Sequence, residues 1–199
     1  MHSEDWSLES DGEGRVTGRV DLPGMEGGLV LKFEARAAMP SQAQVDAVRE
    51  FVDAWPALRD TLAQSLRAYW YATECLAVRD APSPDALADV WSAVWLNEMH
   101  VPDLAAKGSR LVRVEGECDW APDQGLEIGV RNAAELLYLG PNEGKALREP
   151  AFASPWNYAD ARVRDAALSG TPVDEEAFAD ARAAATPVGT AKRPWWKRW

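Results

Sequence analysis

The stretch LVRVEGECDWAPDQGLEIGV, residues 111–130, alternates apolar and polar side chains on both sides of a proline-containing turn. Alternation of this kind predicts two β-strands, each with one face toward a core and one toward solvent. Pro122 suits the first corner of a type I turn, and Gly125 can take the left-handed conformation that closes it. We therefore expect a β-hairpin over residues 117–130.

More strands are predicted on either side of this hairpin. The pattern over residues 15–36 alternates around a glycine-rich turn, which predicts two antiparallel strands, with a third near Trp6 and Leu8. Residues 135–139 form a short apolar run and predict a strand after the hairpin.

Between these strand regions the spacing of apolar residues becomes helical. Ser41 and Gln44 have the spacing of a capping box, so a helix is expected to begin there, and Pro56 either begins a second helix or kinks the first. A third helix is expected from Ser83, with Trp91, Val94 and Trp95 in its apolar stripe. Helical spacing favours core packing of the two tryptophans over a ligand pocket.

These elements predict an α+β fold in which an antiparallel sheet packs against two or three helices. Residues 1–145 are expected to form this core domain. Residues 146–190 are alanine-rich and predict a helical appendage, with one helix from Ser154 to Gly170 and another after Thr171. The last nine residues, 191–199, form a separate tail.

The chain carries 32 acidic and 21 basic residues, a net charge of −11. Such a charge disfavours nucleic-acid binding, because phosphates would be repelled, but it suits either a basic protein partner or simple solubility. Strand parity places a set of acids on the outward face of the hairpin, and these are our candidate partner contacts: Glu115, Glu117, Asp119, Asp123 and Glu127.

Few residues offer nucleophilic or metal chemistry. The two cysteines, Cys75 and Cys118, stand far apart, and only His2 and His100 supply imidazoles, so we expect no structural zinc site and no cofactor. An enzyme pairing Cys75 or Cys118 with His100 is the alternative; we favour both thiols as buried apolar groups. The amino terminus lacks a signal-peptide pattern and no apolar run reaches spanning length, so we expect a cytoplasmic protein.

The tail AKRPWWKRW is opposite in charge to the rest of the chain. It can dock on the acidic body, bind a partner, or rest on an anionic membrane, and we favour docking. Its contact residues would be Lys192, Arg193, Trp195, Trp196, Lys197, Arg198 and Trp199.

From residue 29 to residue 140 the chain resembles a bacterial family of unknown function, domain of unknown function 6985. The matching positions are Cys118, Trp120, Gly125, Leu126, Gly129 and Gly140. Residues 121–124 depart from the family pattern, which has acidic and histidine positions there, so the resemblance implies no catalytic imidazole at the hairpin tip. Similarity to immunity proteins of polymorphic toxin systems implies a non-enzymatic protein that masks a basic, toxin-like partner.

Overall fold

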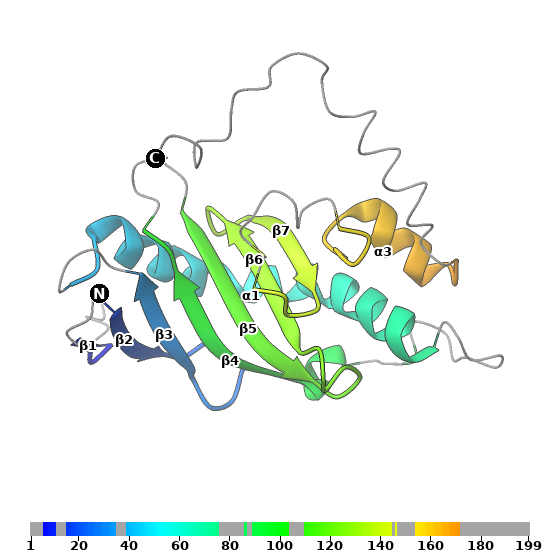
Figure 1. The fold of residues 1–199 in the computed structure, drawn as a ribbon, viewed down its shortest axis with the longest axis horizontal. Helices are drawn as coiled ribbons and strands as arrows, with labels where there is room; N and C mark the ends of the chain where they lie inside the picture. The colour runs from blue at the N-terminus through cyan, green and yellow to red at the C-terminus, as the bar shows by residue number, and fades with distance from the viewer. Residues whose placement is uncertain are drawn as a thin grey trace, which may run out of the picture.

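The computed structural model describes residues 6–10, 15–34, 39–75, 86, 89–103, 110–144, 146 and 154–171. Seven strands in this part of the chain form one sheet in sequence order, and a long helix covers one of its faces (Figure 1). The strands are β1 (Glu9–Ser10), β2 (Arg15–Val20), β3 (Leu29–Glu34), β4 (Val94–Val101), β5 (Leu111–Cys118), β6 (Leu126–Arg131) and β7 (Glu135–Gly140). The predicted α+β class and the predicted hairpin, now β5 and β6, are confirmed.

The helix α1 (Gln42–Trp70) lies between β3 and β4 in the chain, and this crossover makes β3 and β4 the parallel pair of an otherwise antiparallel sheet. The predicted capping box is present, with Ser41 as N-cap. The buried Gln44 side chain also donates to the carbonyl oxygens of Glu34 (3.1 Å) and Val101 (2.9 Å). These bonds tie the start of α1 to the ends of both parallel strands.

The helix continues through Pro56, so of the two alternatives at this position the structure has a single helix rather than a pair. A proline inside a helix costs about 3 kcal/mol because it removes a hydrogen bond and crowds the preceding turn. Pro56 itself is exposed, whereas Trp55 and Leu58 on either side of it are buried. Burial of the apolar face along both halves of α1 offsets that local cost.

The prediction of a third helix is wrong over residues 89–101, which the structure describes. Residues Val90–Ala93 form only a short 3-10 turn, η3, and β4 begins at Val94. Trp91 is buried as expected, but Trp95 is 49% exposed and does not join the core. The sequence VWLNEMHV alternates in burial, and pairing with β3 and β5 makes it a central strand rather than a helix.

The core lies between the sheet and α1, and α3 (Ala161–Leu168) packs beside α1 (Figure 1). This helix begins after an Asp160 cap, later than the predicted start at Ser154, and ends where predicted, before Gly170. Tyr158, Val163 and Ala167 belong to the same buried cluster as the sheet. This part of the predicted appendage therefore packs into the main core; the second predicted helix, after Thr171, and the tail 191–199 lie outside the described residues.

Residues just before α3 cover the edge of β7. The Asn157 side chain accepts from the Leu139 N–H (3.1 Å) and donates to the Leu137 carbonyl (2.9 Å), as a neighbouring strand would. The Tyr158 N–H donates to the Leu139 carbonyl (2.8 Å). This satisfies part of an edge that would otherwise present unpaired backbone groups. Among the helices described, none is long and apolar enough to cross a membrane.

Candidate functional site

Charged side chains form two neighbouring rows across the face of the sheet opposite α1. Strand register places members of each row directly beside one another on adjacent strands. The carboxylate row consists of Glu98, Glu115 and Glu127; the basic row consists of Lys32, His100 and Arg113. Like charges directly opposed on adjacent strands destabilise a sheet, so each row requires the other.

The two rows are joined by a chain of ion pairs. Lys32 Nζ lies 2.5 Å from Glu98 Oε2, and Arg113 Nη2 lies 2.7 Å from Glu115 Oε1. Arg113 Nη1 also reaches Glu127 Oε1 at 3.5 Å. The hydrogen bond from Lys32, together with the positive charges of Lys32 and His100, lowers the pKa of the Glu98 carboxyl group.

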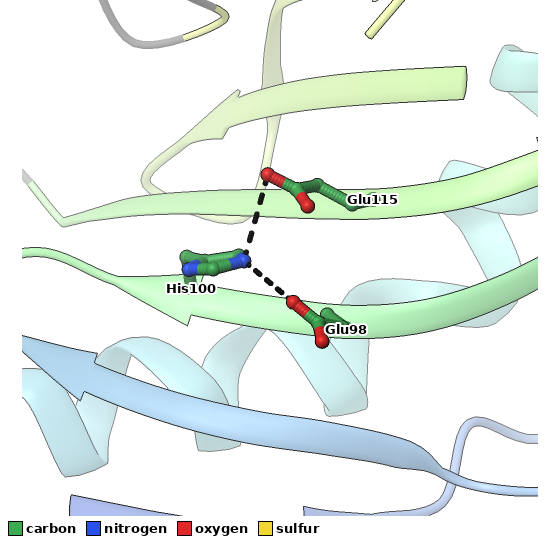
Figure 2. Close-up of side chains that lie close together, drawn as sticks. All are labelled: Glu98, His100 and Glu115. Carbon is green, nitrogen blue, oxygen red and sulfur yellow. Dashed lines mark hydrogen bonds and ion pairs between the residues drawn. The ribbon is translucent and has the colours of Figure 1, made fainter. Parts of the chain in front are cut away.

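His100 stands between the first two glutamates (Figure 2). Its Nε2 lies 3.2 Å from Glu98 Oε2 and 3.5 Å from Glu115 Oε1. All three side chains are partly buried, with 18%, 31% and 21% of His100, Glu98 and Glu115 exposed. His100 therefore contacts one carboxylate on its own strand and one on the neighbouring strand.

A bulge in β4 places two consecutive side chains outside the core. The register between β4 and β5 shifts from Leu96 to Glu98, so Asn97 is the extra residue of the bulge. Leu96 and Met99 are buried, whereas the side chains of Asn97 and Glu98 between them lie outside the core. The Asn97 amide donates to Glu117 at 3.3 Å. Bulges commonly redirect side chains near functional surfaces.

Beside the rows is an open depression of about 440 Å³, which we call the acidic depression. Its lining consists of four carboxylates, three amide side chains and two glycines: Glu98, Glu115, Glu117, Asp123, Asn97, Gln124, Asn142, Gly116 and Gly125. Within the described ranges no cationic side chain lines it. Three of the predicted partner contacts, Glu115, Glu117 and Asp123, are therefore brought together here.

The other two predicted contacts lie elsewhere. Asp119 is exposed but does not line the acidic depression. Glu127 is fully buried, so its expected position on a solvated face is wrong. The chain after β7 folds back over this part of the sheet, where the Glu143 N–H donates to Glu127 Oε2 at 3.2 Å.

Two glycines of the sheet permit this covering. A Cβ atom at Gly129 would lie 2.5 Å from the Ala146 carbonyl oxygen, and one at Gly140 would lie 2.2 Å from the Trp156 carbonyl oxygen. Real Cβ atoms do not approach backbone so closely, so any side chain there would displace the covering segments. Both glycines are among the positions that carry the family resemblance.

The sheet separates the Cys118 thiol from the His100 side chain. Cys118 lies on the core side of β5, whereas His100 contacts groups on the opposite face. Burial raises the pKa of the Cys118 thiol to about 12. Burial, then the charge of Glu74, raises the pKa of the Cys75 thiol. The raised pKa values keep both thiols protonated near neutral pH, whereas a cysteine nucleophile reacts as the thiolate.

Glu98, Lys32 and Arg113 were not identified as site residues from the sequence. His100 was considered there as a base for cysteine and as one of too few imidazoles for a structural zinc site. The signal that could have found the pair on β4 is the Glu-x-His spacing, which places Glu98 and His100 on one face once the segment is known to be a strand.

The family comparison covers this site. A family model described as "Domain of unknown function (DUF6985)" matches residues 5–147. The chain belongs to this family. The DUF6985 match includes both charged rows and the acidic depression, and it ends before α3. Comparisons with curated proteins and with solved structures gave no match.

Proposed function

We propose that this DUF6985 protein is a non-enzymatic cytoplasmic binding protein whose acidic depression receives a cationic group of a basic protein partner. The observation that carries the proposal is the lining itself, four carboxylates and three amides without a cationic side chain among the described residues. A lysine or arginine side chain of a partner would supply the missing positive charge, and the amides would hydrogen-bond around it.

An exposed aromatic ring beside the depression supports the same kind of ligand. Trp95 lies directly opposite Glu117 across β4 and β5 and is 49% exposed. A cation near the face of a tryptophan gains about 0.5–1 kcal/mol at an exposed site. A guanidinium group that pairs with Glu117 can therefore also contact Trp95.

The whole-chain charge of −11 would steer a basic partner toward this face. By analogy with immunity proteins, the partner would be a basic toxin-like domain whose positive surface is masked on binding. The alternative of membrane attachment concerns the tail residues 191–199, which lie outside the described part of the chain.

The test is a titration of isotope-labelled protein with an oligo-arginine peptide, followed by amide chemical shifts in NMR spectra. Shifts are expected to concentrate at residues 97–98, 115–117 and 123–125. The double variant Glu117→Gln/Asp123→Asn should weaken binding, whereas Glu26→Gln/Asp53→Asn, which removes the same charge from exposed positions outside the depression, should weaken it much less.

Equal weakening by both double variants would indicate a general charge effect and would overturn the assignment of the depression. Shifts confined to residues outside it would do the same. Capture experiments with the two variants as matched baits can then identify the natural partner.

A further inference from the structure

The three residues drawn in Figure 2 have the donor atoms and spacing of a metal site. Two ligands about 2.0–2.2 Å from a tetrahedral zinc ion lie about 3.3–3.5 Å apart. The distances from His100 Nε2 to Glu98 Oε2 and to Glu115 Oε1 are 3.2 and 3.5 Å, so two edges of such a polyhedron are already formed. The ligand atoms of the three side chains all lie within 4.8 Å of one another, so the two carboxylate oxygens would have to come somewhat closer together around an ion.

We propose that Glu98, His100 and Glu115 bind a divalent first-row transition-metal ion such as zinc. One imidazole nitrogen and two carboxylate oxygens suit Zn²⁺ and its neighbours better than Mg²⁺ or Ca²⁺, which prefer oxygen ligands alone. Three protein ligands leave at least one coordination position open. Glu98 and Glu115 also line the acidic depression, which gives the ion a path from solvent and directs the open position toward it.

The neighbouring cations act as supports for these ligands. Lys32 and Arg113 contact the same carboxylate groups that face His100, and hydrogen bonds of this kind commonly fix ligating carboxylates. Their positive charges oppose that of the ion, while Glu127, paired with Arg113, offsets one of them.

The test is calorimetric titration of the full chain with zinc chloride, using His100→Gln and two matched controls. Wild-type protein should bind one ion, and His100→Gln should lower the affinity at least about tenfold, since even loss of a supporting partner typically costs 10–100-fold. His2→Gln removes the other histidine of the chain, and Glu26→Gln removes an exposed acid outside the depression; both should keep the wild-type affinity.

A second measurement does not depend on the folding of any variant. In wild-type protein, the ring nitrogen resonances of His100 should shift on addition of zinc in proportion to the bound fraction. Equal zinc affinity of wild type and His100→Gln, loss of binding in His2→Gln alone, or unshifted His100 resonances at saturating zinc would each overturn the proposal.

Discussion

Glu115 and Glu127 lie directly opposite each other on β5 and β6, yet Glu115 keeps 21% of its side chain exposed and Glu127 keeps none. Arg113 contacts both carboxylates, at 2.7 and 3.5 Å. Two opposed carboxylates in a sheet repel each other, and a buried one is costly unless it is paired. Arg113 is therefore the residue that allows the carboxylate row to extend under the covering segment.

Replacing Arg113 should destabilise the fold strongly. Arg113→Met is expected to lower the free energy of unfolding by about 3 kcal/mol, because removing one partner of a buried ion pair is strongly destabilising. Arg131→Met breaks an exposed pair with Glu135 on the same sheet and should cost much less, because exposed ion pairs contribute little. Urea unfolding of the three proteins measures both values, and similar small losses would contradict the role given to Arg113.

The fold class followed from local patterns, because β2, β3, β5 and β6 each alternate over their own length and β7 is a short apolar run. The central strand β4 was misread because Trp91, Val94 and Trp95 also fit helical spacing, and only pairing with β3 and β5 decides between the two structures. Local sequence also does not decide whether Pro56 begins a second helix or lies within one. Packing against distant residues outweighs the low helix propensity of proline.

The candidate site was harder to predict than the fold. The alternation of side chains along β5 correctly placed Glu115 and Glu117 on the outer face of the sheet. It could not show that residues after β7 fold back and bury Glu127. His100 meets Glu115 only through the register of β4 with β5, and a one-residue slip would separate them. The bulge at Asn97 has no local sequence mark that fixes this register.

The turn between β6 and β7 offers a stabilising substitution. Asn132 and Ala133 both have positive φ values, 51° and 52°, and the Ala134 N–H donates to the Arg131 carbonyl at 3.2 Å. This is the geometry of a two-residue hairpin turn in which glycine is preferred at the second position. Ala133→Gly should raise the free energy of unfolding by about 0.5–1 kcal/mol, because it relieves the left-handed strain. A lower thermal midpoint in the variant would contradict this expectation.

The thiols should be slow to react in the native protein. A pKa of about 12 for Cys118, against an ordinary value of 9.0, reduces its thiolate fraction at pH 8 by a factor of about 1000. Cys75 is also buried with a raised pKa. Iodoacetamide labelling followed by mass spectrometry should therefore proceed slowly in buffer and rapidly in denaturant. Rapid labelling of either cysteine in the native protein would contradict this expectation and support the alternative of a Cys–His enzyme.

Alkaline pH should unfold this protein, because several buried groups resist losing a proton. Burial raises the pKa of Tyr158 from 10.0 to about 12. Burial likewise raises the pKa of Tyr69 and of Tyr138, with smaller contributions from neighbouring ionisable groups. For each group the native state holds its proton at pH values where the unfolded chain has released it.

The direction of the effect follows from this difference in bound protons. Stability falls with pH wherever the unfolded state binds fewer protons than the native state. The contribution of Cys118 is therefore present below about pH 9 and that of Tyr158 below about pH 10, and both are lost as pH rises toward 12.

Urea unfolding at increasing pH should show a steady fall in the free energy of unfolding above pH 9, and tyrosinate absorbance should rise together with unfolding. Tyr158→Phe keeps the ring that stacks on Tyr69 and removes one ionisable group, so its alkaline loss should be smaller. A stability that stays level across this range, or tyrosinate formed while the protein is still folded, would contradict the burial of these hydroxyl groups.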